Sequence, residues 1–301
     1  MSQQKYEAFV KVVESGSVSR AAEDLGLTQS AVSHALSSLE ERFGFPLVQR
    51  SRAGVKLTAE GRRVLPAVRD VLSAEMRLTE AVSAIHGLST GTIRVGTFSS
   101  VAVHWLPAML KVFQAQHPNI RFKLLNGDYH DVEQWLLEGA VDVGFVSLPT
   151  RAPGSVTPLM EDRLLAILPK DHPLASLPRF PISYARQESF ISLLETSDHD
   201  LRRALDAEGI RPQVRFETKD DYAIIAMVEQ GLGIAIMPEL LLVGRTDNVK
   251  ALELAPQAKR TIALAVTDQG SKSPATSLFA AFVTDWVKGN KGLAKGADPV
   301  L

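Results

Sequence analysis

The chain has 301 residues with 45% hydrophobic and 22% charged content, which is globular composition and excludes a disordered or fibrous protein. Its 33 basic and 34 acidic residues nearly cancel, so overall charge predicts no attraction to nucleic acid or to an anionic membrane, and any such partner must be met by a local patch. The absence of cysteine excludes disulfides and thiolate metal sites. The sequence has no signal peptide and no apolar run near the ~18 residues of a membrane span, which predicts a soluble cytoplasmic protein with no membrane partner.

The start of the chain predicts three short helices. An amphipathic helix ends near Gly16, and Ser17 or Ser19 caps a second one, because a short side-chain oxygen accepts a free first-turn amide. Gly26 ends this second helix, since glycine tolerates the left-handed conformation, and Thr28 caps the third. Two helices joined by a short turn that contains glycine have the outline of a helix-turn-helix.

The third helix has two different faces. Its apolar residues form one stripe that we expect to face the second helix: Ala31, Val32, Ala35, Leu36 and Leu39. The opposite face presents short or flat side chains with hydrogen-bonding groups: Gln29, Ser30, Ser33, His34 and Ser37. Such side chains can approach base edges closely. Because no Lys or Arg lies between Leu25 and Leu39, the helix could contact bases without neutralising phosphates.

Cations that could hold DNA lie just downstream. Arg50, Arg52 and Lys56 belong to a segment that alternates and turns like a small β-wing around Ala53-Gly54, which would place them beside phosphates. The alternative interpretation is a core helix with a solvated polar face, followed by arginines that are merely solvated.

A long helix is predicted from its cap, Thr58, to Ile85. Residues at alternating spacings of 4 and 3 form a seam that two helices could bury together: Val64, Val68, Val71, Glu75, Leu78, Val82 and Ile85. About 30 residues at ~1.5 Å each give a length of ~45 Å, which favours dimerisation over a lone helix packing on its own domain. Pro66 predicts a bend within this helix, or alternatively a helix that starts at Pro66.

Beyond a hinge at residues 87–91, strands alternate with helices in two α/β units, and a cleft between such units is a common site for small ligands. The polar residues expected to line it are Thr97, Ser99, Ser100 and Ser147 from one unit and Thr196 and Thr218 from the other. The stretch Thr97 to Ser100, where a strand meets a helix start, offers hydroxyls and free amides together to a carboxylate or other polar group. Each of these residues is alternatively a simple cap or turn residue.

Two stretches resemble one known family. The run GSVSRAAEDLGLTQSAVSHALSSLEERFGFPLVQRSRAGVKLTAEG, from Gly16 to Gly61, is similar to the N-terminal signature of LysR-type transcriptional regulators, and VEQGLGIAIMP, from Val228 to Pro238, resembles their effector-domain motif. The resemblance covers nearly the whole chain and implies an α+β multidomain protein. Its implied domains are a winged helix-turn-helix at 1–57, a linker and dimerisation helix at 58–87, a hinge at 88–91 and a periplasmic-binding-protein-like α/β effector domain at 92–301. Within the effector domain, subdomain I covers about 92–162 and 267–289, and subdomain II covers about 163–266.

The resemblance also implies roles for matching positions. Bases would be faced by Gln29, Ser33 and His34, wing-side phosphates by Arg50 and Arg52, and the recognition helix would start at Thr28. The family commonly has Arg, Lys or Gln at the position of His34 and often a cation near Ser37, so this helix departs from the pattern. Fewer cations release fewer counterions, which predicts a shallower salt dependence of DNA binding. Protonation of His34 near neutral pH would then modulate affinity, which is a hypothesis.

Recognisable catalytic motifs of the forms HxxxH, CxxC and GxxxxGK[ST] are absent, so we expect no enzyme activity, no cofactor and no metal. The predicted function is that of a dimeric or tetrameric transcriptional regulator that binds inverted-repeat double-stranded DNA and whose sensor domain binds a small-molecule effector. Two alternatives are a constitutive DNA-binding protein with an empty cleft, and a ligand-binding protein whose N-terminal domain serves only assembly.

Overall fold

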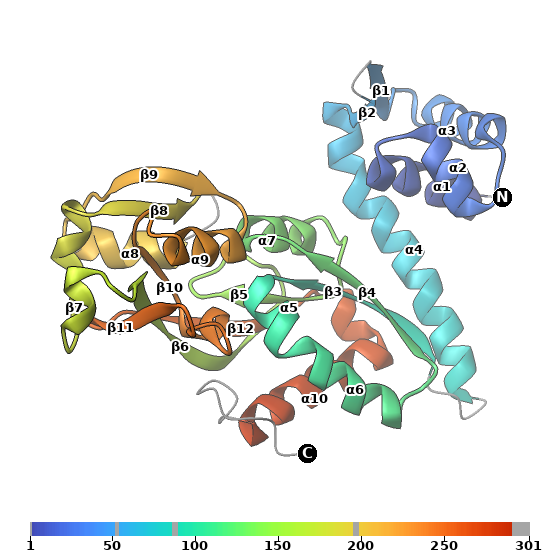
Figure 1. The fold of residues 1–301 in the computed structure, drawn as a ribbon. Helices are drawn as coiled ribbons and strands as arrows, with labels where there is room; N and C mark the ends of the chain where they lie inside the picture. Colours follow the sequence, from blue (N-terminus) through green and yellow to red (C-terminus); the bar gives the residue numbers. More distant parts are fainter. Residues whose placement is uncertain (1, 52–53, 86–89, 195–198, 291–301) are drawn as a thin grey trace.

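The computed structural model describes residues 2–51, 54–85, 90–194 and 199–290, so Arg52, Thr196 and part of the predicted hinge lie outside the described residues. A small N-terminal domain stands at one end of a long helix, and a larger α/β domain lies along the other end (Figure 1). The elements of the first part are α1 (Ser2–Ser15), α2 (Val18–Leu25), α3 (Gln29–Phe43), β1 (Val48–Ser51), β2 (Gly54–Leu57) and α4 (Ala59–Ile85).

The predicted caps fix where α2 and α3 begin. Ser17 is the N-cap of α2, its side chain accepting from the amide of Arg20, and Gly26 ends this helix in the left-handed conformation at a φ of 63°. Thr28 caps α3, because its Oγ1 accepts from the amide of Ala31 at 3.2 Å. The helix-turn-helix outline predicted from these short polar residues and one glycine is therefore confirmed.

Helix α4 begins inside the core of the N-terminal domain. Thr58 Oγ1 accepts from the amide of Gly61 at 2.9 Å, as the predicted cap requires, and Leu65 and Val68 are buried against residues of α1 and α3. The helix runs unbroken through Pro66, so the alternative start at that residue is wrong. Since Val68 is already buried, the predicted seam is open to a partner only in its later half.

The later half of α4 carries an exposed apolar row. The side chains of Val71, Leu78, Val82 and Ile85 are 49%, 65%, 49% and 82% exposed, respectively. Large apolar side chains that recur along one side of a long helix usually mark a contact surface.

The other side of α4 is tied to the α/β domain. Arg69 Nη1 donates to the carbonyl oxygen of Glu138 at 3.1 Å. Arg94 Nη2 donates to Ser73 Oγ at 3.0 Å while the same guanidinium pairs with Asp142. These contacts hold the linker helix against the first subdomain.

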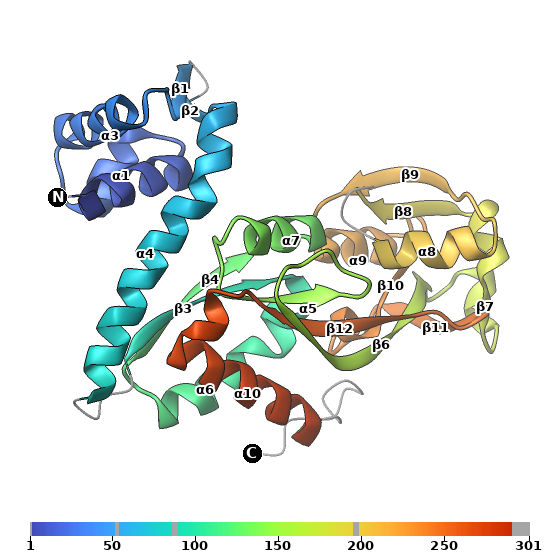
Figure 2. The same ribbon diagram turned by 180° about the vertical axis from the view of Figure 1, so that it is seen from behind.

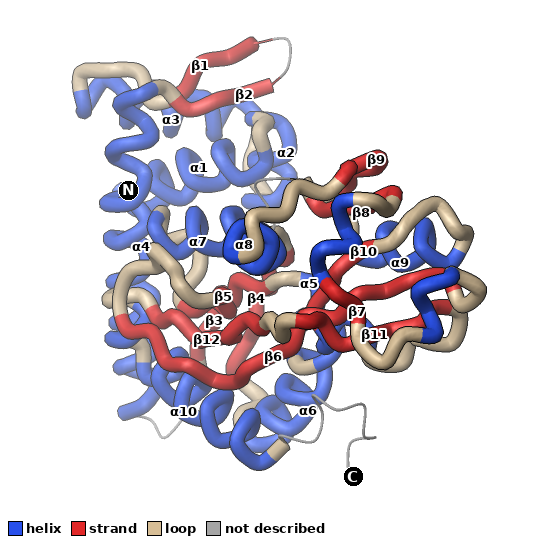
Figure 3. Tube along the Cα trace, turned by 90° about the vertical axis from the view of Figure 1, so that its left-hand side faces the viewer, coloured by secondary structure: helices blue, strands red, loops and turns tan. Residues whose placement is uncertain are grey.

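The first subdomain is a parallel sheet covered on both faces. Its strands β3 (Gly91–Thr97), β4 (Ile120–Asn126) and β5 (Val143–Ser147) lie in the order β4-β3-β5, joined by α5 (Ser99–His104), α6 (Leu106–Gln116) and α7 (Tyr129–Leu137). Helices α6 and α10 (Pro274–Gly289) pack on one face and α7 on the other (Figure 3). The predicted βαβαβ unit is therefore present.

The second subdomain continues the same sheet with β7 (Phe180–Pro181), β10 (Ala235–Pro238) and β11 (Val249–Ala255). Two further strands, β8 (Ser189–Leu193) and β9 (Gln213–Thr218), pair with each other in a separate two-stranded sheet. Its helices are α8 (His199–Ala207), α9 (Asp221–Glu229) and the short 3-10 helices η1 (Pro173–Ser176), η2 (Ile182–Arg186) and η3 (Glu239–Leu242). The 3-10 helix η4 (Gly270–Lys272), near the end of the chain, contacts α10 of the first subdomain. The long strand β6 (Ser155–Pro169) pairs with β10, β11 and β12 (Lys259–Val266), so it passes from one subdomain into the other (Figure 2).

Strand β12 does not belong to the second subdomain, to which the predicted range of about 163–266 assigned it. It pairs antiparallel with β5, and Ile262 and Leu264 are buried in the same core as Ile93 of β3. The physical reason is that its apolar run lies between two strands and is covered on both faces. The boundary between the subdomains therefore falls near the start of β12.

We expect Gly61→Ala to destabilise the N-terminal domain by about 2 to 3 kcal/mol, because a Cβ at this position would meet the carbonyl oxygen of Leu47 at 2.0 Å and the backbone would have to shift. The measurement is the urea midpoint followed by circular dichroism. Gly289→Ala is the control, since a Cβ there meets nothing within 4 Å and alanine favours the helix. Equal losses in the two variants would contradict this packing argument.

Candidate functional site

The outer face of α3 is polar and accessible. Most of the predicted base-facing residues are exposed, and Ser33 is half-buried; the exposed ones are Thr28, Gln29, Ser30, His34 and Ser37. Ala31, predicted in the apolar stripe, is exposed as well, because it lies about 100° around the helix from Val32. The buried stripe consists of Val32, Leu36 and Leu39.

The wing is placed beside α3 by a side chain that sequence reasoning missed. Glu40, on the last turns of α3, accepts from the amides of Leu47 and Val48 at 2.7 and 3.2 Å. Strand β1 then pairs antiparallel with β2, with Arg50 opposite Val55. Arg50 thus lies on a strand whose start is hydrogen-bonded to α3, and its contact with phosphate stays a prediction.

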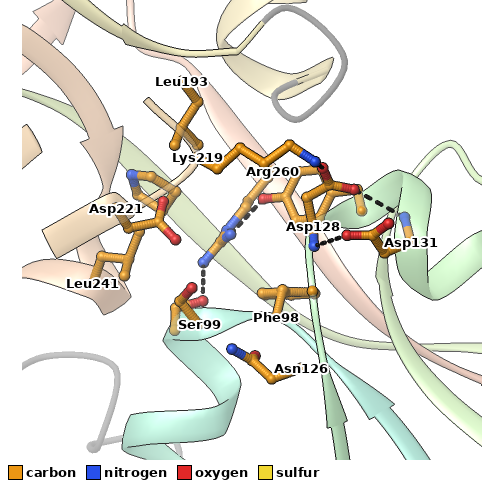
Figure 4. A pocket seen from close by; sticks show the side chains of 14 residues that line it. Phe98, Ser99, Asn126, Asp128, Asp131, Leu193, Lys219, Asp221, Leu241 and Arg260 are labelled. Carbon is orange, nitrogen blue, oxygen red and sulfur yellow. Dashed lines mark hydrogen bonds and ion pairs between the residues drawn. The ribbon is translucent and has the colours of Figure 1, made fainter. Parts of the chain in front are cut away.

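A cavity of about 160 Å³ lies between the two subdomains. Phe98, Ser99, Ser100 and Asp128 line it from the first subdomain, and Lys219 and Asp221 line it from the second (Figure 4). Apolar residues complete the lining, among them Leu193 and Leu241. A partly open cavity with a few convergent polar groups between two subdomains has the form of a small-molecule site.

A buried arginine lies beside this cavity. Arg260 is only 2% exposed; its Nε and Nη2 contact Asp162 at 2.8 and 2.6 Å, and Nη2 also donates to Ser100 at 2.8 Å. Its Nη1 donates to Tyr129 Oη at 2.5 Å, and the guanidinium lies 5.1 Å from the centre of the Phe98 ring. Burial opposes the charge of Arg260, but Tyr129 and Asp162 raise its pKa, so the arginine stays protonated within a neutral pair.

Polar contacts join the two subdomains across the cleft. Ser147 Oγ donates to both carboxylate oxygens of Asp200, at 3.0 and 2.9 Å, and Asp200 also pairs with Arg203. Near the cavity, burial raises the pKa of Asp221, while the neighbouring Ser99 hydroxyl and the Arg260 charge lower it. The cleft is therefore closed in this structure, with residues of both subdomains in contact.

Comparisons with known proteins assign both parts of the chain to one family. Residues 4–62 match the model described as "Bacterial regulatory helix-turn-helix protein, lysR family", and residues 86–288 match the "LysR substrate binding domain". The chain belongs to the LysR family of transcriptional regulators. As a LysR-family member it is a DNA-binding transcriptional regulator with an effector-binding domain, and not an enzyme.

Similar proteins share the whole architecture. The chain is 31% identical over 276 residues to the uncharacterized HTH-type transcriptional regulator YvbU of Bacillus subtilis (strain 168), covering 91% of this chain and 94% of the relative. The fold is similar to that of a full-length OxyR variant from Pseudomonas aeruginosa, with a TM-score of 0.73, 22% identity and 94% of each chain covered. It also resembles full-length CbnR complexed with its target DNA, with a TM-score of 0.64, 19% identity, and 95% of this chain and 100% of CbnR covered.

The predicted effector residues of this LysR-family chain occupy different places. Ser99 and Ser100 line the cavity, whereas the Thr97 hydroxyl is buried and donates to the carbonyl oxygen of Phe98. Ser147 contacts Asp200 as described above, and Thr218 Oγ1 accepts from the amide of Asp220 in a turn. Thr196 lies outside the described residues. Their role in effector binding stays a prediction.

Arg260, Asp128, Asp221 and Tyr129 line the cavity but were not predicted. One sequence signal for Arg260 existed, because it opens the apolar strand KRTIALAV and a charge at the edge of a buried strand requires a partner. Within the described ranges, no group of three or more His, Cys, Asp or Glu side chains could hold a metal ion, and no helix is long and apolar enough to cross a membrane.

We expect Arg260→Met to destabilise the effector domain by about 3 to 5 kcal/mol, because it leaves Asp162 buried without its cation. Adding Asp162→Asn should recover part of this loss in the double variant. The measurement is denaturant unfolding, and the control is Arg163→Met, whose side chain is 48% exposed and should cost only about 0 to 1 kcal/mol. A similar loss for both single variants would contradict the structural importance of the buried pair.

Proposed function

We propose that this LysR-family regulator binds a promoter site through α3 and the β1–β2 wing, and that a small molecule in the cavity between the subdomains controls this binding. The observation that carries the proposal is the exposed, cation-free face of a capped helix that lies inside the helix-turn-helix match. Hydrogen-bonding side chains on such a face suit the major groove.

The proposed DNA contacts divide by chemistry. Gln29, Ser33 and His34 reach base edges, since their groups donate and accept hydrogen bonds. The hydroxyl groups of Thr28, Ser30 and Ser37, at the start of the helix and on its next turns, approach the DNA backbone or the bases. Arg50 and Arg52 neutralise phosphates beside the wing.

The assembly follows from the exposed row on α4. Two copies of Val71, Leu78, Val82 and Ile85 would cover each other in a dimer of linker helices, and a pair of dimers would make a tetramer. Two-fold related N-terminal domains suit inverted-repeat half-sites separated by whole helical turns. The domains proposed for this assembly keep the predicted bounds of 1–57, 58–87 and 92–301, and its proposed location is the cytoplasm, where promoter DNA lies.

Control by an effector requires a difference in affinity. A ligand that binds the open and the closed cleft with equal affinity does not change the equilibrium between these two forms. A ligand with higher affinity for the closed cleft increases the population of the geometry described above. Because the first subdomain contacts α4 through Ser73 and Arg94, a change in closure reaches the linker helix. The relative positions of the two DNA-binding domains would then change.

We expect Gln29→Ala to lower affinity for the promoter DNA upstream of the protein's own gene by about tenfold or more, while binding to unrelated DNA changes little. Arg50→Ala should weaken binding to both DNAs and reduce the slope of log affinity against log salt by about one. Fluorescence anisotropy with a salt titration measures both effects.

The matched control for this DNA experiment is Gln114→Ala, an exposed glutamine on α6 in the effector domain, which should leave DNA affinity unchanged. If Gln29→Ala behaves like this control, α3 does not read bases. If wild type forms no salt-sensitive complex, the N-terminal domain has no DNA role and serves assembly alone.

We expect Leu78→Asp to dissociate the assembly, because a carboxylate on the exposed seam of α4 cannot be buried against a second helix. Sedimentation velocity at micromolar concentration measures the oligomeric state. Leu278→Asp on α10, also an exposed leucine at 39%, is the control and should leave the assembly intact. Unchanged sedimentation of both variants would place the dimer contact elsewhere.

A further inference from the structure

The chemistry of the cavity restricts its ligand, an inference that rests on the proposed effector site. Two cations, Arg260 and Lys219, line the cavity, whereas its lining carboxylates are Asp128, Asp131 and Asp221. Asp162, directly behind Arg260, adds a fourth carboxylate. The fixed charge around the space is therefore negative when these groups are ionised.

Both cations already have partners within the protein. Arg260 uses its Nε, Nη1 and Nη2 nitrogens to donate to Asp162, Tyr129 and Ser100, so its charge is already compensated inside the protein. The Lys219 side chain is 65% exposed at the mouth of the cavity, where water screens it, and its Nζ lies 3.9 Å from Asp128.

Two of the carboxylates have structural duties. Asp128 caps α7 and accepts from the amide of Asp131 at 2.8 Å, while Asp131 accepts from the amide of Asp128 at 3.1 Å. This reciprocal pair is a capping box, so the position of both carboxylates is explained by their role in starting the helix. They do not by themselves identify a ligand.

Asp221 is different. It lies in the first turn of α9, but Asp220 is the residue that caps this helix, accepting from the amides of Tyr222 and Ala223. The Asp221 carboxylate lies beside the cavity near Ser99 and Arg260 (Figure 4). Among the described residues no Lys or Arg forms an ion pair with it; burial raises the pKa of Asp221, and the neighbouring Ser99 hydroxyl and the Arg260 charge lower it.

We propose that the effector is a small primary amine whose protonated nitrogen binds between the Asp221 carboxylate and the Ser99 hydroxyl. Its apolar part lies against Leu193 and Leu241, which line the same cavity. Because Ser99 belongs to the first subdomain and Asp221 to the second, the amine joins both sides of the cleft and favours its closed form. A carboxylate ligand would instead lie beside the Asp221 carboxylate, with which no Lys or Arg of the described residues forms an ion pair, in a partly desolvated space.

The test uses the full chain and matched probes. Isothermal titration calorimetry at pH 7 compares cyclohexylamine with cyclohexanecarboxylate, and 3-methylbutylamine with 3-methylbutanoate. The two members of each pair have similar apolar groups and opposite charges. Wild type should bind each amine about tenfold or more tightly than its matched carboxylate, as a charge-assisted hydrogen bond provides.

Asp221→Asn should reduce this preference to less than about threefold, because the amide keeps the shape and removes the charge. Glu229→Gln, at the far end of the same helix, is the matched control and should keep the preference. Circular dichroism and binding to promoter DNA verify that each variant is folded.

Three outcomes would overturn the inference. The carboxylates could bind as tightly as the amines, the amine preference could survive Asp221→Asn, or neither amine could bind wild type at about 10 mM while promoter binding persists. In each case the proposed function stands, since promoter binding is measured separately. Loss of the proposed function itself would be recognised by the absence of any salt-sensitive DNA complex with wild-type protein.

Discussion

The antiparallel pairing of β6 with β12 is the constraint on which the effector domain depends. Its register sets Arg260 opposite Asp162, and this buried ion pair lies where the chain passes between the subdomains. A slip of one residue would turn Arg260 to the other face of the sheet and leave Asp162 buried without a cation. The position of Ser100, and with it one side of the cavity, depends on the same arginine.

Much of the N-terminal domain could be predicted because its signals are local. Ser17, Gly26 and Thr28 act within three or four residues of their own position, so their spacing alone locates the helices. The cavity could not be predicted in this way, since Arg260 meets Asp162 across 98 residues of sequence and Ser147 meets Asp200 across 53. Such contacts follow from strand register and subdomain closure, which no local pattern determines. The same limit explains the misplaced β12, whose apolar run is compatible with either subdomain until its neighbours are known.

Strand β3 connects the two functional regions of the chain. In the middle of the strand Arg94 contacts Ser73 of the linker helix, and just beyond the C-terminal end of the strand Ser99 lines the cavity beside Asp221. The strand pairs with β4 along its whole length and with β5 at Val95 and Gly96. In the proposed function, a ligand in the cavity therefore lies beside the same strand that contacts α4, and the coupling needs no chain of separate side-chain rearrangements.

The cation-free face of α3 has a consequence for how the protein finds its site. Attachment to arbitrary DNA comes almost entirely from phosphate neutralisation. In the proposed arrangement this depends on the arginines of the wing, because no Lys or Arg lies between Leu25 and Leu39 on α3. Weak attachment shortens each visit to an incorrect sequence and reduces sliding along the duplex. More of the search then takes place by diffusion through solution, and a smaller share of the protein is held on the rest of the chromosome at any moment.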